Sequence, residues 1–464
     1  MSNSSGSGKQ LLKGTGIYAV GTFGTKILMF LIVPLYTYYL DPSEMGTYDV
    51  LIGTIGLLLP IISLQISDSV YRWVIREDAD ALTCIGTSYR FLFVSSFITV
   101  AVVLAVNFFI SIPYMPLFLC ALLSSLFFQF DQKVLRGLKR QWLFAISGIV
   151  YTVTFLALNI VLLCVLHGGV ESLLISYSAA NAIGLLSIML LEDRLQIQKV
   201  AELDLQLLKK MLLYSIPLIP NYLSWWIVES SDKYIVLLFI GVNANGLLAV
   251  AHKFPTILQA VFGLFLNSWQ DLAVANDKAD KEFFTSVFRR VYRFSFAFIW
   301  ALVPITKIFV WLIMGAQYKS ACDYIPFFYL GAIFQAFCSF YGVGYLRTKN
   351  TKGAFSSSVY GACINAVVNI GLIWLAGLQA AAISTFIAFF VMWLIRVMHN
   401  GQELGIRINW AELWLFLLIG ILICVGSILM SPGLNVVLAG LGTVGFFILN
   451  YRDIRHIIGM IRRR

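Results

Sequence analysis

Long apolar segments separated by short polar loops dominate the sequence. Each segment holds roughly the 20 residues that a helix needs to cross about 30 Å of hydrocarbon at 1.5 Å per residue. The pattern therefore predicts an all-α polytopic membrane protein with fourteen transmembrane helices. Their expected ranges are 14–40, 46–71, 86–110, 113–135, 141–166, 169–191, 208–238, 246–271, 286–314, 322–347, 353–375, 378–399, 410–430 and 432–450.

Composition and charge agree with this prediction. The chain is 59% hydrophobic and only 12% charged, which excludes a water-soluble domain of this length. Most of the 33 Lys and Arg residues lie at the N-terminus and in every second loop, and the opposite loops at 41–44, 167–169, 241–246 and 431–435 carry almost none. By the positive-inside rule both termini are cytoplasmic. The net charge of +10 thus reflects topology and does not indicate a nucleic-acid partner.

The two halves of the chain resemble each other. At a shift of 200 residues LDPSEMGTYDV (40–50) lies on IGVNANGLLAV (240–250), which brings Gly46 onto Gly246. At a shift of 203 YRFLF (89–93) meets YRFSF (292–296), and at 210 LALNI (156–160) meets AVVNI (366–370). The alternative is chance alignment of two apolar halves. A true repeat of six helices would return the chain to its starting side, so the copies would be parallel, as in many transporters.

The repeat predicts a domain plan with two six-helix lobes around a central cavity. A cytoplasmic tail covers 1–13, the N-lobe 14–191 and the C-lobe 211–400. Residues 192–210 have apolar and charged helical faces and are expected to form an interfacial linker helix. Residues 401–464 supply two extra helices and a basic cytoplasmic tail. Two lobes facing a cavity predict a transporter that works by alternating access.

Charged residues inside the membrane indicate where function resides, because a charge in hydrocarbon costs at least about 2.5–3.5 kcal/mol unless it meets water or a partner. Lys26 lies roughly 21 Å from the outer end of its helix, near the midplane. It is expected to face the cavity and bind an anion. The alternative is a lysine that extends to the cytoplasmic edge, although a stem of about 6 Å is too short for that.

A second group of charges lies on the seventh and eighth predicted helices. Glu229, Asp232 and Lys253 occupy a narrow range of depth, roughly 9–14 Å from the outer end, and Lys233 follows Asp232 directly. Two carboxylates near amines are suited to binding and releasing a cation. A structural ion pair that closes an outer gate is the alternative. Pro217 and Pro220 in the seventh helix remove backbone hydrogen bonds, and a bend is expected there.

The remaining charges have simpler explanations. Asp68 and Arg72 lie one helical turn apart and are expected to neutralise each other. Topology alone accounts for Arg90, and Asp49 near the outer surface is ambiguous. His252 is expected to be a polar packing residue.

Several stretches resemble the Wzx-type flippases of bacterial polysaccharide synthesis. They are 214–270 (YSIPLIPNYLSWWIVESSDKYIVLLF and onward), 33–51 (VPLYTYYLDPSEMGTYDVL), 69–77 (SVYRWVIRE), 135–150 (LRGLKRQWLFAISGIV) and 314–321 (MGAQYKSA). This family belongs to the multidrug/oligosaccharidyl-lipid/polysaccharide exporter superfamily, with the MATE and MurJ proteins. The resemblance implies 6+6+2 helices in the bacterial inner membrane. It also implies export of undecaprenyl-diphosphate-linked repeat units to the outer leaflet for capsule, O-antigen or related polymers.

The resemblance also implies roles for the charged residues. The resemblance implies that cationic residues of the N-lobe hold the diphosphate, and Lys26 fits this role. The candidates for binding diphosphate or substrate are Lys26, Arg72, Arg90 and Lys253, and those for ion coupling or gating are Glu229, Asp232, Lys233, Asp68 and Asp49. No cofactor or metal is expected, and H+ or Na+ is the candidate coupling ion. The expected partners are the lipid-linked oligosaccharide, membrane lipids and polysaccharide polymerase and assembly proteins, around a monomer.

Other functions fit the sequence less well. A MATE-type cation-coupled drug exporter shares the fold, but its pocket should be rich in midplane carboxylates, whereas Lys26 is basic. The loop after the second helix, RWVIREDADAL (72–82), does not resemble the major-facilitator signature. Outer loops of about ten residues leave no room for an enzyme site, and no P-loop occurs.

Overall fold

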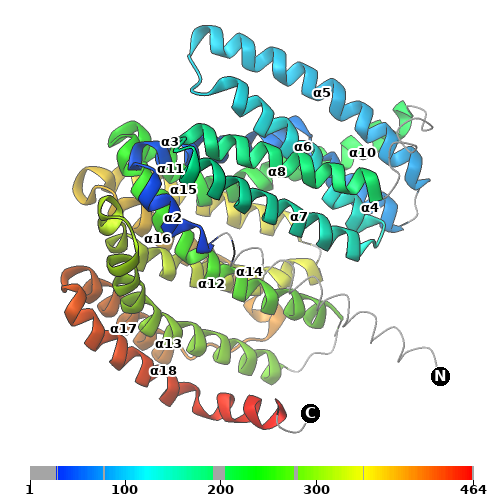
Figure 1. Cartoon of the computed structure of the whole chain (residues 1–464). Coiled ribbons are helices and arrows are strands. Elements are labelled where there is room, and N and C mark those ends of the chain that lie inside the picture. The colour runs from blue at the N-terminus through cyan, green and yellow to red at the C-terminus, as the bar shows by residue number, and fades with distance from the viewer. Residues whose placement is uncertain are drawn as a thin grey trace. The chain divides into compact units, whose positions relative to one another are not determined.

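The chain folds into helices throughout the part that the structure describes, residues 28, 30–76, 79–191, 204–275, 281–348 and 350–461 (Figure 1). This is a computed structural model of the whole chain. The elements are α2 (Val33–Tyr39), α3 (Pro42–Ile62), α4 (Ile66–Arg76), α5 (Ala81–Phe109), α6 (Met115–Gly137), α7 (Gln141–Ile160), the π-helical η1 (Val161–Val165), α8 (Val170–Leu191), α10 (Leu205–Ser215), the 3-10 turn η2 (Ile216–Leu218), α11 (Ile219–Phe239), α12 (Val242–Ala275), α13 (Lys281–Ile313), the 3-10 segment η3 (Ala316–Asp323), α14 (Ile325–Thr348), α15 (Thr351–Ala376), α16 (Gln379–Leu404), α17 (Trp410–Leu429) and α18 (Pro432–Ile461).

Thirteen helical spans in the described residues are long and apolar enough to cross a membrane. They correspond to the second through fourteenth predicted helices. Most of the first predicted helix, 14–40, lies outside the described residues, and α2 is its described end. The prediction of an all-α polytopic membrane protein is confirmed.

Two predicted helices are interrupted. The expected helix 46–71 is divided into α3 and α4, because Leu64 and Gln65 adopt positive φ angles of 45° and 55° that a helix cannot continue through. The predicted single helix there is therefore wrong. At Pro217, where the sequence predicts a bend, the 3-10 turn η2 separates α10 from α11, and the bend itself stays a prediction.

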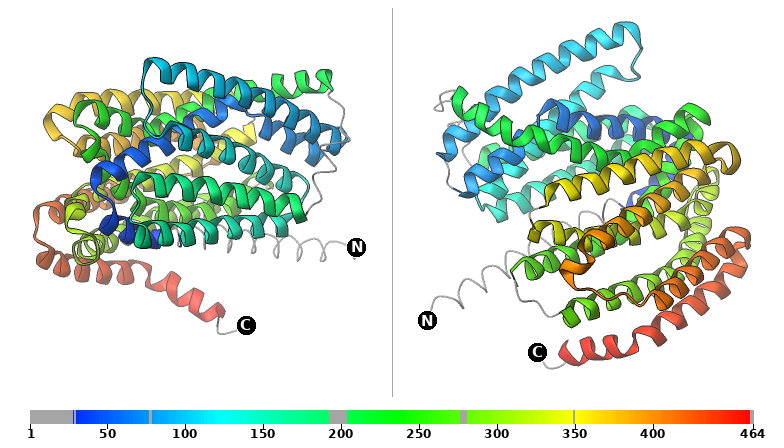
Figure 2. Two further views of the ribbon diagram at one scale, coloured as in Figure 1. Left: turned by 45° about the horizontal axis from the view of Figure 1, so that its top comes forward. Right: turned by 180° about the vertical axis from the view of Figure 1, so that it is seen from behind.

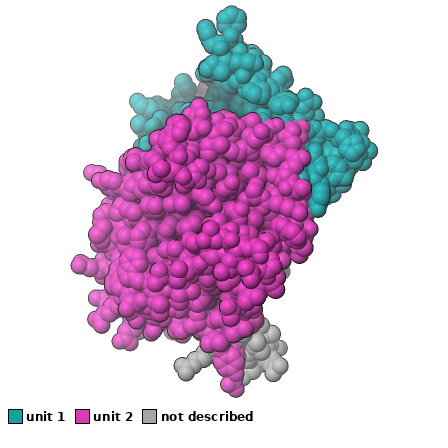
Figure 3. Space-filling model, turned by 90° about the vertical axis from the view of Figure 1, so that its left-hand side faces the viewer, with its two compact units in different colours: residues 1–40, 47–226 teal, residues 41–46, 227–464 magenta. Residues whose placement is uncertain are grey.

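The chain divides into two compact units, shown in different colours in Figure 3. Unit 1 comprises residues 1–40 and 47–226, and unit 2 comprises residues 41–46 and 227–464. Within unit 1, α8 packs against α6 and α7, while α4 packs against α6 and α10. A small cluster of Phe128, Leu135, Leu143 and Ile188 fills the space between α6, α7 and α8.

Unit 2 has the larger core. Its central helix α14 is buried over 78% of its apolar window and packs against α12 and α16. Aromatic rings fill this core. The centre of the Phe337 ring on α14 lies 5.4 Å from that of Phe334 and 5.9 Å from that of Trp393 on α16. The two extra helices α17 and α18 lie along α13, as both views in Figure 2 show, and they cover one side of this unit.

A close crossing of backbones occurs within unit 2, where the short segment 41–46 meets the start of α12. A Cβ atom on Gly246 would lie 1.8 Å from the Pro42 carbonyl oxygen, and one on Gly46 would lie 2.2 Å from that of Val242. The buried Asn245 side chain donates to the Gly46 carbonyl oxygen at 3.3 Å. The two glycines that the sequence repeat brings into register thus meet at one crossing, which only residues without a side chain allow.

Candidate functional site

A network of polar side chains joins α11 to its neighbours inside unit 2. Gln335 on α14 donates through Nε2 to Glu229 Oε1 on α11 at 2.6 Å, and its own Oε1 accepts from Gln259 Nε2 on α12 at 2.6 Å. Glu229 is exposed in this unit. A hydrogen-bonded carboxylate is therefore held at an accessible position in the predicted membrane interior.

Asp232, one helical turn further along α11, lies in a different environment. Its side chain is fully buried, and Oδ2 lies 2.8 Å from His252 Nε2 on α12. Its Oδ1 accepts the backbone N–H of Lys233 at 2.9 Å. The His252 ring also lies against Phe328 of α14, with 4.0 Å between ring centres. The prediction that His252 is only a packing residue missed this pair, because the sequence alone does not show which face of α12 meets α11.

Neutral polar groups continue the network toward α15 and α16. Ser231 Oγ donates to Asn365 Oδ1 at 2.8 Å, and Asn365 Nδ2 donates to Thr385 Oγ1 at 3.3 Å. Lys233 and Lys253 are half-buried on the same two helices that carry Asp232 and His252. The structure thus brings together Glu229, Asp232, Lys233 and Lys253 in one unit, around partners that the sequence did not identify.

This arrangement is suited to holding a cation or a proton. Glu229 and Asp232 supply carboxylate oxygens at one level, while amides and a hydroxyl orient the surrounding groups. Buried charged groups in a membrane helix are costly and often mark ion or proton pathways. We take the α11–α12 polar network, defined by Glu229, Asp232, His252 and Gln335, as the candidate functional site.

Asp68 and Arg72 of unit 1 do not pair as expected. Asp68 on α4 forms an ion pair with Lys133 of α6 and accepts from the Tyr222 hydroxyl at 2.9 Å. The Arg72 guanidinium instead lies over the Tyr214 ring, 4.3 Å from its centre. The prediction that the two neutralise each other is wrong, because each contacts a side chain of a neighbouring helix: Asp68 pairs with Lys133, and Arg72 packs on Tyr214. These contacts tie α4 to α6 and to α10–α11 within the unit.

The other candidates are more scattered. Lys26 lies outside the described residues. Arg90 is exposed on α5, and Asp49 is 7% exposed on α3. The roles of all nine candidates in binding or coupling stay predictions.

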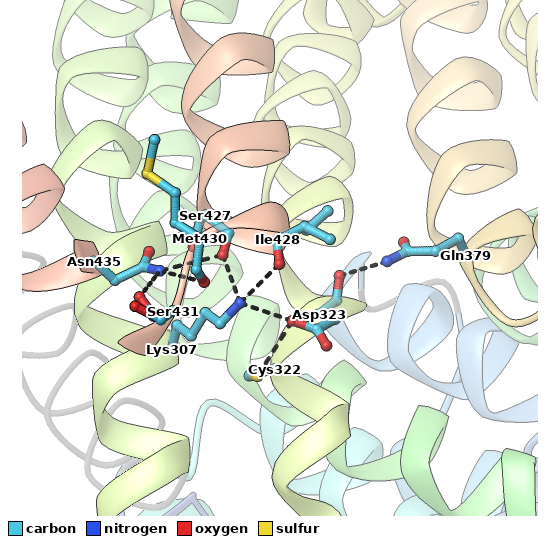
Figure 4. Close-up of polar contacts among 9 residues, drawn as sticks. All are labelled: Lys307, Cys322, Asp323, Gln379, Ser427, Ile428, Met430, Ser431 and Asn435. Atoms are coloured by element: carbon cyan, nitrogen blue, oxygen red, sulfur yellow. Dashed lines mark hydrogen bonds and ion pairs between the residues drawn. The ribbon is translucent and has the colours of Figure 1, made fainter. Parts of the chain in front are cut away.

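Lys307 is a buried charge that the sequence interpretation missed. It lies on α13 with 7% exposure, and its Nζ donates to Asp323 Oδ1 at 3.0 Å and to the Ser427 and Ile428 carbonyl oxygens at 2.6 Å and 3.0 Å (Figure 4). A cation at the last carbonyls of α17 is favoured by the helix dipole. Burial and the neighbouring Asp323 raise the pKa of the Cys322 thiol to about 12. The sequence feature that could have indicated this buried charge is the position of Lys307, six residues before the end of the apolar helix α13.

Comparison with known proteins shows where the chain belongs. The model of a family described as "Polysaccharide biosynthesis protein" matches residues 11–269, more than half of the chain. The chain belongs to this family. No protein of curated function matches the sequence significantly.

The fold of this polysaccharide biosynthesis family member also occurs in solved transporter structures. The lipid II flippase MurJ, in an inward closed conformation, aligns with a TM-score of 0.67 at 15% identity over 95% of this chain and 99% of that one. A MATE family multidrug transporter in an inward-facing conformation aligns with a TM-score of 0.67 at 12% identity, over 85% and 95% of the two chains. A mutant form of the Vibrio cholerae MATE transporter VcmN aligns with a TM-score of 0.51 at 14% identity over 87% and 100%. The fold is therefore that of the MurJ and MATE transporters.

A second missed charge in this family member is Arg396 on α16, which is 4% exposed. Its guanidinium donates to the Ser357 and Ser358 hydroxyls at 3.1 Å and 3.2 Å and to the Cys338 carbonyl at 2.8 Å. These contacts join α14, α15 and α16 and are sufficient to explain a structural role. Arg396 lies three residues before the end of the predicted helix 378–399, so its position in the sequence does not indicate that it is buried.

Proposed function

We propose that this protein is a flippase that moves polyprenyl-diphosphate-linked oligosaccharide repeat units from the cytoplasmic to the outer leaflet of the bacterial inner membrane. The observation that carries the proposal is membership of the polysaccharide biosynthesis family combined with a fold shared, over 95% of the chain, with a lipid II flippase. Lipid II, like the proposed substrate, is a lipid-linked saccharide. The exported units would supply a capsule, an O-antigen or a related polymer.

The diphosphate is the charged part of this substrate, and basic side chains would bind it. A diphosphate prefers cations that have no carboxylate beside them. Lys26, near the midplane of its predicted helix, is the main candidate, and Arg72, Arg90 and Lys253 are secondary ones. The Arg72 guanidinium lies over the Tyr214 ring, while Asp68 pairs with Lys133, and this supports the assignment.

The membrane potential and an ion gradient would drive alternating access. A substrate with about two negative charges gains roughly 4–5 kcal/mol when it moves outward across 100 mV, inside negative. Glu229 and Asp232 would carry H+ or Na+ inward while the empty carrier resets, with Lys233, Asp68 and Asp49 as gating candidates. No cofactor enters this scheme. With both termini cytoplasmic, Arg72 of α4 and Arg90 of α5 would lie on the substrate-loading side.

Native mass spectrometry of protein gently purified from its own host tests the proposal. A bound species with the mass of a polyprenyl diphosphate plus a sugar repeat is expected, and its mass would identify the glycan. The control is the same preparation incubated with excess undecaprenyl diphosphate. Binding of ordinary phospholipid alone, even after that addition, would overturn the assignment.

A MATE-type exporter of cationic drugs is the second candidate function. The MATE transporter aligns with the same TM-score as MurJ, and the buried carboxylate Asp232 is a group that a cation would bind. Ethidium efflux from cells that express the protein separates the two. A flippase should leave ethidium accumulation unchanged, whereas efflux lost in Asp232→Asn would favour drug export.

A further inference from the structure

Asp232 and His252 form a buried carboxylate–imidazole pair between α11 and α12. We infer that this pair is the proton-binding site that couples export to a proton gradient, with His252 as the side chain that receives the proton. The inference rests on the proposed function. It adds the identity of the ion and a residue, His252, that had no assigned role.

The pair has the geometry of a shared-proton site. His252 Nε2 lies 2.8 Å from Asp232 Oδ2, and the second carboxylate oxygen accepts the Lys233 backbone N–H at 2.9 Å. The Asp232 side chain is fully buried and that of His252 is 22% exposed. Phe328 covers the imidazole from α14. A proton from water would therefore bind the partly exposed imidazole, and the buried carboxylate would stabilise the imidazolium that forms.

One proton decides whether the pair is neutral. With the proton bound, imidazolium and carboxylate charges cancel, and the pair is tolerated in an apolar interior. Without it the pair carries one net negative charge, which burial strongly disfavours. Histidine is the side chain whose ordinary titration falls between pH 5 and 8. The buried arrangement is therefore the proton-loaded form, and proton loss favours opening toward water.

Several charged and titratable groups on the neighbouring elements make contacts outside the pair, namely Glu229, Asp323, Tyr329, Asp41 and Glu44. The charged and titratable groups on the elements nearest in the fold are Glu229 and Lys233 of α11, Lys253 of α12, Tyr329 of α14, Tyr318, Lys319, Cys322 and Asp323 of η3, and Asp41 and Glu44 of the segment 41–46, which crosses the start of α12. Glu229 accepts from Gln335, Asp323 pairs with Lys307, and Tyr329 bonds to Thr306. Asp41 and Glu44 cap the start of α3 by bonding to each other's backbone N–H groups.

The depth of the pair suits proton entry from outside. Asp232 lies seven residues before the end of α11, and His252 lies ten residues after the start of α12, which places them roughly 10 Å and 15 Å from the outer ends. A proton binds the imidazole lone pair from the outer side and leaves as a proton on the cytoplasmic side. Inward proton flow would then accompany the outward movement of the anionic substrate.

Proton flux in proteoliposomes tests the inference. The full chain is reconstituted in vesicles that contain pyranine, with undecaprenyl diphosphate carrying one N-acetylglucosamine as the probe. Probe-dependent proton flux is expected in the wild type. It should fall at least tenfold in His252→Gln and Asp232→Asn, and stay unchanged in His399→Gln. His399 is a matched control, since this exposed histidine of unit 2 bonds to Tyr345, 2.9 Å away.

Probe binding, measured in parallel by native mass spectrometry, separates this test from the proposed function. Bound probe with flux retained in His252→Gln would overturn the proton site and leave the flippase intact. Bound probe with transport that follows a sodium gradient and ignores pH would do the same. Absence of probe binding in the wild type would instead overturn the proposed function.

Hydrogen exchange supplies a second measurement that needs no substrate. After correction for intrinsic exchange rates, wild-type peptides covering 228–256 should lose protection between pD 5.5 and 8. The loss should disappear in His252→Gln and persist in His399→Gln. A wild type with equal protection at both pD values would contradict the inference, as would an unchanged pD dependence in His252→Gln. This readout also detects a variant that has merely unfolded, because it would exchange rapidly at both values.

Discussion

Single basic side chains decide whether an anionic headgroup can enter a hydrocarbon interior. Lys26→Ala should abolish export, because it removes the midplane cation expected to hold the diphosphate, and Lys26→Arg should keep part of it, because the charge remains with a different shape. Surface polysaccharide on cells that carry each variant is the measurement. Export that survives Lys26→Ala at the wild-type level, with equal protein in the membrane, would remove Lys26 from the binding site.

The buried ammonium of Lys307 should matter for stability. Lys307→Met removes the ammonium that donates to Asp323 and to the Ser427 and Ile428 carbonyl oxygens. The Ser427 carbonyl keeps its bond from Asn435, but that of Ile428 loses its donor, and a buried group left unsatisfied costs about 1–3 kcal/mol. A clear fall in the midpoint of thermal unfolding in detergent is expected. Lys319→Met is the control, because the Lys319 ammonium lies 4.8 Å from the Trp311 ring centre and such a contact is worth about 0.5–1 kcal/mol at an exposed site. Equal midpoints for the two variants would show that the Lys307 contacts do not stabilise the fold.

Depth along a helix could be predicted from the sequence, but partners could not. Glu229 and Asp232 were placed at one level by counting residues, and the structure has them on the same helix in one network. Their partners Gln335 and His252 come from α14 and α12, and helix rotation decides which side chains face α11. The same limit explains Asp68, whose partner Lys133 is 65 residues away. Lys307 was missed because the depth argument was applied only to the charges of the first, seventh and eighth predicted helices.

The crossing of the segment 41–46 with α12 depends on two glycines. Gly246→Ala should destabilise the protein by about 1–3 kcal/mol, because its Cβ would overlap the Pro42 backbone and overpacking costs that much. Alanine is otherwise the better helix former by about 1 kcal/mol. Gly263→Ala, on the same helix with nothing within 4 Å of the added Cβ, should therefore be neutral or stabilising. Thermal unfolding of the two variants decides this, and a Gly246→Ala midpoint at or above that of Gly263→Ala would contradict the crossing.

Helix extents were predictable where a residue type enforces the break. Pro217 cannot donate a backbone hydrogen bond, and the chain forms the 3-10 turn η2 at that point. Leu64 and Gln65 carry no such signal. Both residues take up positive φ angles, and the Ser63 hydroxyl accepts the Gln65 N–H at 3.2 Å. Such a break depends on tertiary context, so apolar periodicity extends straight through it.

Over the whole molecule, the two repeated halves differ in how far corresponding helices are covered by other helices. Arg293 of α13 lies 3.5 Å from Glu412 of α17, and α17 and α18 pack along this helix. Its counterpart Arg90 lies on α5, of which only 17% of the apolar window is buried within the structure. A repeat can be detected from the sequence as a shift of about 200 residues. The contacts of the extra pair of helices cannot, because they occur in one half only.

The full transport cycle should move net charge across the membrane. Two negative substrate charges moving outward and one proton moving inward add in the same electrical sense, since each makes the inside more positive. Moving one charge across 100 mV is worth about 2.3 kcal/mol, so three such charges amount to roughly 7 kcal/mol.

Valinomycin with a potassium gradient that makes the vesicle interior negative should accelerate export of the undecaprenyl-diphosphate probe from the interior. In separate vesicles with equal potassium on both sides, nigericin dissipates only the pH gradient. It should slow export by a smaller factor than the factor by which the potential accelerates it. In His252→Gln the potential should still accelerate any residual export, whereas the nigericin effect should vanish. Wild-type export that is indifferent to the potential would mean that the substrate crosses with its charge neutralised, by bound cations or by the protein's own basic residues moving with it.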